Sequence, residues 1–439
     1  MKLFLENVRS FEGWHEIPIT PATVLLGENS SGKSTLLAML SVVTSDGFPF
    51  NGNVFNQFPF ELGGFKTIAT NKRGIKHFTV GFETRIPNHF RFHSELYKSA
   101  KYIECGLVCV FTENNGLPIP CEIVIWLDKK SILFSEKLND KLSYIHTEIV
   151  ENKKIKNTIS YEFDSAKQQG LQFPDIQKKL IDQLRSQKSS KNLEEDEFIE
   201  FIFRLFISGR FNQIGDFSSI AFAPVRSRPR RTYDQLSDER SSEGDHVPLL
   251  LARAVDPHNK QVASLHSAIQ SFGEYSEMFN DIVVKPLGKG SGDPFQVQVK
   301  KDNQKTNMLD VGYGVSQVLP LIVDAERAAG NKLLLLQQPE VHLHPKAQAA
   351  LGSMIKDWVG KGKKVVVETH SDYLVDRLRL EVKREKLKPE HLTIYFLDQK
   401  NKQTTVHKLD VDKEGNILNA PEGYRDFFLR EQMALLMGD

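Results

Sequence analysis

Cysteine is scarce in this sequence, and charge of either sign is not in excess. The three cysteines, Cys105, Cys109 and Cys121, lie in a region of alternating apolar residues, without a second cysteine pair or a nearby histidine. This pattern excludes a zinc site built on paired cysteines and indicates buried thiols in strands, as in a reducing cytosol. The 57 Lys and Arg against 56 Asp and Glu give a net charge of +1. Any basic surface for nucleic acid must therefore be local.

Long apolar runs, sustained heptads and internal repeats are missing as well. No run reaches the ~18 apolar residues of a membrane span, and no heptad pattern predicts a long coiled-coil arm. Residues Lys2–Val8 have the composition of a strand rather than of a signal peptide. We therefore expect a cytoplasmic protein that does not act at a membrane. A chain of 439 residues is long enough for two or three domains.

The sequence does contain a complete phosphate loop. An apolar run at 24–26 enters the pattern G-x-x-x-x-G-K-S, and an apolar helix is expected at 36–40. The N–H groups of such a loop converge on phosphate oxygens, and the helix dipole adds positive charge. Lys33 would reach the β- and γ-phosphates, and the Ser34 hydroxyl would ligate Mg²⁺. The chain is thus expected to bind a nucleoside triphosphate through Gly27, Glu28, Asn29, Ser30, Ser31, Gly32, Lys33, Ser34 and Thr35.

The rest of the chain predicts an α/β fold that is interrupted by an insertion. Residues 66–165 alternate apolar and polar positions and favour an antiparallel meander, and 166–214 favour helices. Residues 215–439 return to strand–helix alternation, so the nucleotide domain that begins in 1–65 is predicted to resume there. An apolar tail at 424–437 is expected to form a docking helix.

Three further motifs lie in the C-terminal part. A glycine-containing turn, with Gly312, Gly314 and Gln317, opens an apolar helix. The buried strand expected at 333–336 ends in Gln337, Gln338, Pro339 and Glu340, followed by His342, Leu343, His344 and Pro345. A second buried strand, expected at 364–367, ends in Glu368, Thr369, His370 and Ser371.

This order of motifs resembles the ABC-type ATPases, in the branch of SMC-like, RecF-like and overcoming-lysogenization-like proteins. The segments around Glu340 and His370 resemble those of a narrower prokaryotic group, which includes the ATPase subunit of the Septu antiphage system. The similarity covers roughly residues 1–65 and 215–430. It implies an ABC-type head, with a mixed or parallel sheet around the phosphate loop and a β-rich lobe.

The resemblance also implies roles for individual residues. His370 would be the switch histidine that reaches the γ-phosphate of ATP. Gly312, Gly314 and Gln317 match the signature turn, which in ABC-type heads caps the γ-phosphate bound by the neighbouring subunit. His344 falls where the inter-subunit loop of ABC-type heads normally carries Asp. A head-to-tail homodimer or a larger even assembly is therefore expected, with ATP and Mg²⁺ as ligands.

The sequence departs from the ABC-type pattern where the catalytic carboxylates should stand. The Mg²⁺-orienting Asp is replaced by Gln337 and the water-polarising Glu by Gln338. An amide carries no charge and is a poor proton acceptor, and a general base typically contributes 10²–10⁴-fold in rate. We expect slow hydrolysis. Glu340 or Glu368 are the candidates to replace the missing charge, and Glu368 is favoured because it shares a strand face with His370. A structural hydrogen bond is the alternative role for Glu368.

Three functions remain open at this point. The preferred one is a regulatory ATPase of antiviral defence that controls a separately encoded nuclease, of the HNH type if the Septu resemblance holds. The second is a RecF-like ATPase that acts on DNA directly. The third is a self-contained nuclease, because Asp410 and Asp412 resemble the paired carboxylates of Toprim nucleases, although this stretch reads better as a strand that enters a turn. A basic run is a candidate contact for DNA or a partner: Arg226, Arg228, Arg230 and Arg231. The alternative is a solvated loop, or arginines that pair with the nearby Asp234, Asp238, Glu239 and Asp245.

Overall fold

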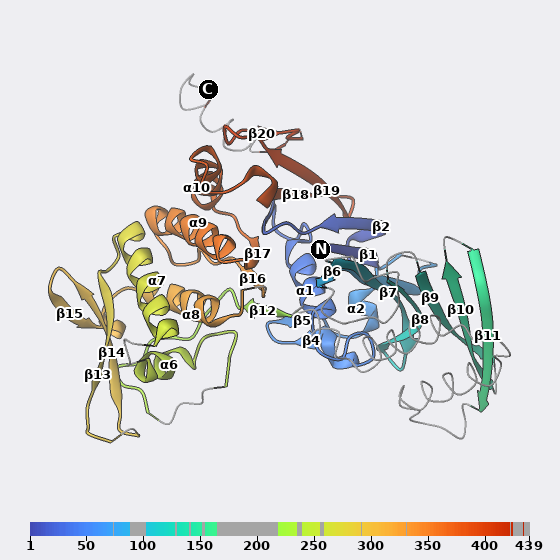
Figure 1. Cartoon of the computed structure of the whole chain (residues 1–439), viewed down its shortest axis with the longest axis horizontal. Helices are drawn as coiled ribbons and strands as arrows, with labels where there is room; N and C mark the ends of the chain where they lie inside the picture. The colour runs from blue at the N-terminus through green and yellow to red at the C-terminus, as the bar shows by residue number, and fades with distance from the viewer. Residues whose placement is uncertain are drawn as a thin grey trace. The chain divides into compact units, whose positions relative to one another are not determined.

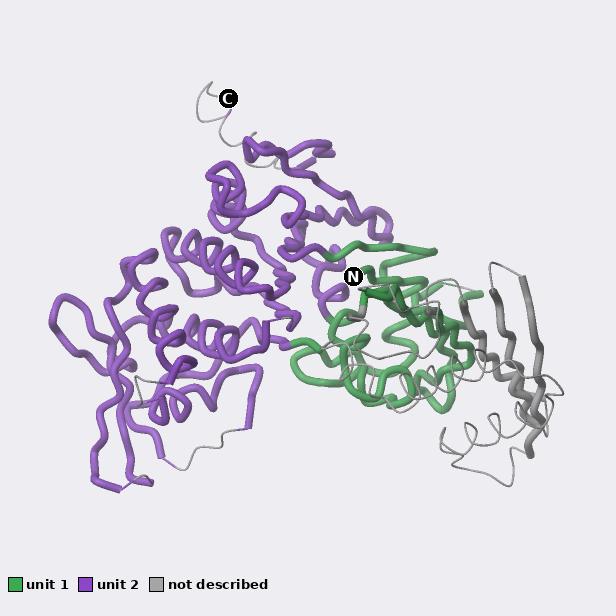
Figure 2. Tube along the Cα trace, viewed as in Figure 1, with its two compact units in different colours: residues 1–19, 38–219 green, residues 20–37, 220–439 purple. Residues whose placement is uncertain are grey.

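The chain forms two compact units, each built from two separate stretches of sequence. Unit 1 comprises residues 1–19 and 38–219, and unit 2 comprises residues 20–37 and 220–439 (Figure 2). The computed structural model describes every residue except 73, 88–101, 128–129, 140–141, 152–153, 165–217, 235–238, 255–258, 291, 331, 422, 425–432 and 434–439. The helices predicted at 166–214 and nearly all of the predicted tail at 424–437 therefore lie outside the described residues.

Unit 1 is built on an eight-stranded antiparallel sheet, which confirms the predicted meander (Figure 1). The strand order is β11-β10-β9-β8-β7-β6-β1-β2. A cluster of aromatic rings fills its core, where the stacked rings of Phe78 and Phe111 lie 5.2 Å apart. The strands are β1 (Lys2–Val8), β2 (Phe11–Pro18), β6 (His77–Pro87), β7 (Tyr102–Asn114), β8 (Leu117–Leu127), β9 (Lys130–Asn139), β10 (Leu142–Glu151) and β11 (Lys154–Asp164).

The predicted first part of the chain, 1–65, is divided between the two units. Strands β1 and β2 join unit 1 because residues 2–6 of β1 pair with β6, and β2 pairs with β1. Strand β3 (Ala22–Gly27) and the phosphate loop belong to unit 2, and helix α1 (Lys33–Val43) follows the loop. Unit 1 also contains short elements, which are a 3₁₀ turn at Gly52–Phe55, β4 (Asn56–Gln57), β5 (Phe60–Glu61) and α2 (Phe65–Ile68).

Unit 2 is built on a seven-stranded sheet with the order β12-β16-β17-β3-β18-β19-β20. Its central strands β16, β17, β3 and β18 run parallel, and their apolar runs are buried, as expected of parallel strands covered by helices. The strands besides β3 are β12 (Ser219–Phe222), β16 (Leu333–Gln337), β17 (Lys364–Glu368), β18 (Leu392–Lys400), β19 (Gln403–Val411) and β20 (Ile417–Leu418). An α/β fold is thus confirmed.

Helices pack on this sheet and enclose the main apolar core, in which Trp358 is fully buried. Helix α7 lies against both α8 and α9 (Figure 1). None of the helices among the described residues is long and apolar enough to cross a membrane. The helices are α6 (Val247–Arg253), α7 (Lys260–Ser276), α8 (Tyr313–Arg327), α9 (Pro345–Gly360) and α10 (Asp372–Lys383), with 3₁₀ turns at Met308–Asp310 and Pro389–His391. A small antiparallel sheet contains β13 (Asp281–Pro286), β14 (Phe295–Lys301) and β15 (Gln304–Asn307).

Candidate nucleotide-binding site

The candidate site lies at one edge of the unit 2 sheet, where three parallel strands end side by side. Strand β3 runs into the phosphate loop, β16 ends at Gln337, and β17 ends at Glu368. The sheet register pairs Gln337 with Glu368 and Glu368 with Leu25. Residues from three distant parts of the sequence therefore meet beside one loop.

The phosphate loop turns tightly between β3 and α1. Gly27 has φ +142°, and a Cβ there would lie 2.2 Å from the carbonyl oxygen of Leu397, so no other residue fits. The ammonium of Lys33 donates to the carbonyl oxygens of Gly27 and Glu28 at 2.9 and 2.6 Å. Thr404 supports the loop from β19 by donating its hydroxyl to the Ser31 carbonyl at 2.8 Å. Burial lowers the pKa of Lys33, and neighbouring carboxylates oppose that shift.

A carboxylate faces the predicted Mg²⁺ ligand. The Ser34 hydroxyl donates to Glu368 Oε1 at 2.8 Å, across a sequence separation of 334 residues. Glu368 is buried, and its Oε2 has no hydrogen-bond partner among the described residues. Burial raises the pKa of Glu368, while the Ser34 bond and the charge of Lys33 oppose the rise. A cation beside Ser34 would relieve this unfavourable burial, so the donor set fits Mg²⁺.

The end of β16 places amides where the ABC-type pattern has carboxylates. Gln337 and Gln338 are both half-buried. Gln338 adopts a left-handed backbone with φ +42°, and its N–H donates to the Glu368 carbonyl oxygen at 2.9 Å. This backbone bond ties the end of β16 to the end of β17. The amide of Gln337 can offer an oxygen to a cation, but it brings no charge.

Glu340 lies beyond β16 and reaches back to the switch-histidine loop. Its Oε1 accepts the His370 backbone N–H at 2.7 Å, and its Oε2 has no hydrogen-bond partner in the part of the chain that the structure describes. Burial raises the pKa of Glu340. His370 is exposed at its surface, but partial desolvation of its ring, followed by the charge of Lys33, lowers its pKa. The structure therefore groups His370 with Lys33, Glu340 and Glu368.

The predicted signature turn begins α8. Gly312 is the N-cap residue and is exposed, whereas Gly314 is buried. Gln317 is also buried, and its amide holds another backbone: Oε1 accepts the Arg226 N–H at 3.0 Å, and Nε2 donates to the Arg226 carbonyl at 3.3 Å. Its side chain is thus occupied within its own subunit. This role differs from the one that the resemblance implies for it.

The histidines after β16 belong to the start of α9. His344 is the N-cap residue of that helix, and its Nδ1 accepts the Ala347 N–H at 3.3 Å. The ring of His342 lies 6.0 Å from that of Tyr313, at the signature turn. The described residues contain no group of three or more His, Cys, Asp or Glu side chains that could hold a metal.

The basic run does not form one exposed patch, because its arginines differ in burial and pairing. Arg226 is only 2% exposed, because it packs against Gln317. Arg231 is exposed but pairs with Asp310 at 2.7 Å. Arg228 and Arg230 are exposed, so only part of the run can meet a phosphate backbone.

The carboxylates of the proposed nuclease have structural partners. Asp410 pairs with Lys408 at 2.7 Å on β19, and Asp412 accepts the Asn416 N–H at 2.8 Å in the turn that follows. The expected change from strand to turn at this point is confirmed. A nuclease centre at these two residues finds no support in this geometry.

Arg226 is the residue whose position the sequence analysis missed. An arginine within a dense basic run is typical of a solvated surface, whereas this one is buried. The nearest signal is the run of buried apolar residues at 221–223, which ends three positions before Arg226, since the chain that leaves a buried strand can carry a side chain into the core. The supporting Thr404 gave no comparable signal.

Comparisons with known proteins place the chain among ATPases. A family model described as an AAA ATPase domain matches residues 1–375. The chain is similar to an SMC head bound to the C-winged helix domain of ScpA, with 13% identity, 94% of this chain and 98% of that chain covered, and a TM-score of 0.46. It is also similar to an Smc head domain bound to the C-terminal domain of ScpA from Pyrococcus furiosus, with 11% identity, 99% of this chain and 98% of that chain covered, and a TM-score of 0.41. A third similar structure is the SMC head domain from Thermotoga maritima, with 10% identity, 93% of this chain and 98% of that chain covered, and a TM-score of 0.38. The comparison with curated proteins gave no match.

Proposed function

The chain belongs to the AAA ATPase domain family, and we propose that it binds ATP with Mg²⁺, hydrolyses it slowly and uses it as a switch. The observation that carries this proposal is the hydrogen bond between Ser34 and Glu368, at 2.8 Å. It brings a buried carboxylate to the place where the phosphate loop offers its hydroxyl to the metal. Glu368, at the end of β17, thereby replaces the Asp that β16 lacks.

The phosphate loop supplies the binding. Lys33 holds its ammonium inside the loop, close to where the terminal phosphates of a nucleotide would lie, and Glu368 and Glu340 compensate its charge. Ser34 and Glu368 would hold Mg²⁺, with the Gln337 oxygen as a neutral third donor. When bound, Mg²⁺ neutralises charge on the β- and γ-phosphates.

Slow turnover follows from the groups that face the attacking water. Gln338 stands where a Glu would polarise that water, and an amide cannot accept its proton. Glu340 is engaged with the His370 backbone through one oxygen and keeps the other free. Burial and the charge of Lys33 lower the pKa of His370, which favours the neutral imidazole, and its ring N–H can donate one hydrogen bond to a γ-phosphate. Hydrolysis is thus supported by weaker groups than usual.

A slow ATPase is better suited to a conformational output than to a fast motor. We therefore propose that the chain is the regulatory ATPase subunit of an antiviral defence complex, acts as a homodimer or larger even assembly, and controls a separately encoded nuclease of the HNH type. The motifs around Glu340 and His370, which are similar to the Septu ATPase subunit, support this role. A RecF-like action on DNA is less favoured, because Arg226 is buried and Arg231 is paired.

Binding of a fluorescent ATP analogue tests the site. In wild type, Mg²⁺ should tighten binding relative to EDTA. Lys33→Ala should abolish binding in both buffers. Glu368→Gln should keep the EDTA affinity but lose the Mg²⁺-dependent gain, since a carboxylate and a cation about 4 Å apart interact by ~4 kcal/mol at an effective dielectric near 20. An unchanged Mg²⁺–ATP affinity in Glu368→Gln would contradict the proposed metal site.

A second experiment tests the switch. The chain is purified together with the product of the neighbouring gene, and nuclease activity is measured with ATP, with a non-hydrolysable analogue and with ADP. Co-purification and nucleotide-dependent cutting support the regulatory role. Strong stimulation of ATP hydrolysis by DNA would favour RecF-like processing instead, and metal-dependent cutting by this chain alone would favour a self-contained nuclease.

A further inference from the structure

We propose that a small pocket on helix α8 is a docking site for a partner protein, which inserts one apolar side chain flanked by carboxylates of the same segment. The inference deepens the proposed function and rests on it for the identity of the partner, the separately encoded nuclease. The pocket, called the docking pocket below, is lined by the arginine loop (residues 226–233), by the turn at 240–246, and by α6 and α8.

The interior of the docking pocket is small and apolar. Its cavity volume is about 20 Å³, which is room for the end of one side chain. A site for a small-molecule ligand usually has roughly 300 Å³ or more, so a nucleotide or a cofactor does not fit. An apolar side chain that enters gains hydrophobic and dispersion stabilisation. Buried apolar residues form much of the lining, among them Pro229, Val247, Pro248, Leu251, Leu319 and Pro320.

The rim of the docking pocket offers positive charge. Arg228 and Arg230 line it and are exposed, and within the described residues neither has an ion pair. The next arginine, Arg231, donates two hydrogen bonds to Asp310, at 3.0 and 2.7 Å. The exposed carboxylate of Asp245 also lies on the rim. The two unpaired arginines therefore favour carboxylates, while the pairing of Arg231 and the charge of Asp245 disfavour a long polyanion such as nucleic acid.

The arginine loop is held in place without a partner. At its start, the Gln317 amide on α8 bonds both the N–H and the carbonyl of Arg226, at 3.0 and 3.3 Å. At its end, buried Tyr233 exchanges backbone hydrogen bonds with Phe295, at 2.9 and 3.0 Å. The Tyr233 hydroxyl also accepts the Arg230 N–H at 3.0 Å. A loop that is already ordered loses little conformational entropy when a partner binds.

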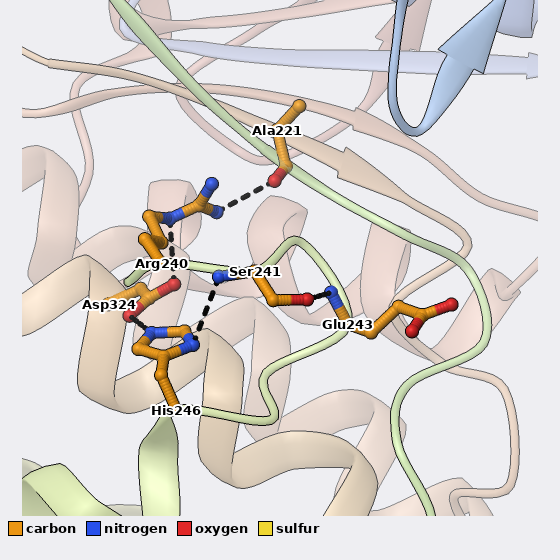
Figure 3. Close-up of polar contacts among 6 residues, drawn as sticks. All are labelled: Ala221, Arg240, Ser241, Glu243, His246 and Asp324. Carbon is orange, nitrogen blue, oxygen red and sulfur yellow. Dashed lines mark hydrogen bonds and ion pairs between the residues drawn. The ribbon is translucent and has the colours of Figure 1, made fainter. Parts of the chain in front are cut away.

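The turn at 240–246 is fixed to α8 by a buried polar cluster. Asp324 on α8 meets Arg240 Nε and His246 Nε2, each at 2.9 Å, and Figure 3 shows these two side chains converging on it. Gly244 has φ +88° and lies against α8, so that a Cβ there would be 2.4 Å from Pro320 Cγ. The arginine loop and this turn are thus each anchored on α8, beside the same pocket.

The place of the docking pocket on α8 suits the partner of a nucleotide switch. Ser316, Leu319 and Pro320 of α8 line the pocket, and the same helix begins after Gly312, in the predicted signature turn. A partner that docks here contacts the helix that the resemblance directs toward the neighbouring subunit's nucleotide. This placement favours the controlled nuclease as the occupant.

Fluorescence anisotropy with a labelled model peptide tests the chemistry of the docking pocket on the full chain. The probe is a capped pentapeptide with a central leucine and two glutamates on each side. It should bind about tenfold more tightly than the same peptide with a central serine, since the pocket buries part of a leucine side chain. A peptide with lysines in place of the glutamates should not bind, and added salt should weaken binding of the probe.

Two variants separate the rim from the interior. Arg228→Glu combined with Arg230→Glu should lower the affinity for the probe about tenfold or more, because both charges are reversed. Lys289→Glu combined with Lys305→Glu is the matched control, since both lysines are exposed and outside the pocket lining. Ser227→Phe should block the pocket, because the half-buried Ser227 lines it, whereas Ser227→Ala should bind as wild type. Unchanged binding of the ATP analogue verifies folding, and if Ser227→Phe does not fold, the charge reversal decides.

The purified product of the neighbouring gene tests the occupant. Its complex with the chain should be lost in both pocket variants and kept in both controls. If it does not bind wild type, the proposed control of a nuclease fails, while the peptide data still decide the chemistry of the docking pocket. A nuclease complex that tolerates every variant would overturn the inference, and so would a probe that binds no better than its serine form. Duplex DNA that binds wild type but not the charge-reversed variant, with no binding of the probe, would assign the arginines to nucleic acid instead.

Discussion

The ends of β16 and β17 lie side by side in the same parallel sheet, yet they carry opposite chemistry. β16 ends in two uncharged amides, Gln337 and Gln338, and β17 ends in the buried carboxylate of Glu368. The Ser34 hydroxyl beside them donates to the carboxylate on β17. Under the proposed function, β17 would supply the carboxylate that the ABC-type pattern places on the neighbouring strand.

From this difference we infer that the position of the charge matters more than the strand that provides it. The two strands are in register, so Gln337 and Glu368 start from paired backbone positions. A cation beside Ser34 can be met from either strand. We expect the water-polarising function to be replaced less well, because Glu340, the carboxylate next along the chain from Gln338, already has one oxygen bound by the His370 N–H.

The largest effect expected from this comparison is on turnover. Glu368→Gln should lower Mg²⁺-dependent kcat about 10- to 100-fold, the cost typical of losing a group that orients a metal site. Gln337→Leu, at the paired position of β16, should cost much less, because its amide brings no charge. Both variants are assayed at saturating ATP across a Mg²⁺ titration. Equal losses in the two variants would remove the distinction between the strands.

The missing base can be restored at β16. Gln338→Glu should raise kcat by about tenfold, the lower part of the range for a general base, since the rest of the site is not adapted to it. ATP affinity should not change, because the phosphate loop provides the binding and Gln338 is not part of that loop. Gln338→Asn is the control and should stay slow. An unaltered rate in Gln338→Glu would mean that a step other than water activation limits turnover.

A smaller effect is expected when the carboxylate proposed to face the metal is moved from β17 to β16. Gln337→Asp in the Glu368→Gln background should recover part of the lost turnover, since an Asp at the paired position returns a carboxylate to the same edge. The recovery should be incomplete, because the shorter side chain starts one strand further from Ser34. Mg²⁺ dependence of ATP binding is the second readout. A double variant that is no better than Glu368→Gln would show that only β17 can serve.

Much of the fold and part of the candidate site can be predicted from the sequence. The phosphate loop, the buried strands before and after it, and the meander of unit 1 follow from period-two and period-3.6 patterns, and β1 occupies the predicted Lys2–Val8. Glu368 stands out as a charge in an apolar strand, next to His370. These are local signals, which depend on neighbours within a few positions.

The contacts that complete the site could not be predicted in this way. Ser34 and Glu368, which share a hydrogen bond, are 334 residues apart in the sequence. Gln317, which accepts the Arg226 N–H, is 91 residues from it. Which side chains meet at such distances is decided by the strand order of the sheet and by helix packing, which composition does not encode. A basic run therefore predicts solvent exposure even when one of its arginines is buried.

The smallest expected effect contrasts the two ends of β17. Lys364 begins the strand, and burial lowers the pKa of its ammonium. The folded state therefore binds fewer protons than the unfolded state between this lowered pKa and 10.5, so the cost of Lys364 is fully present at low pH and is relieved as the pH rises through that window. Lys364→Met should raise Tm by about 1–3 °C at neutral pH and flatten the rise of stability toward pH 10. Thermal unfolding from pH 7 to 10 measures both, with the exposed Lys388→Met as control. A fall in Tm would mean that the Lys364 ammonium makes an interaction in the folded state that outweighs the cost of its partial burial.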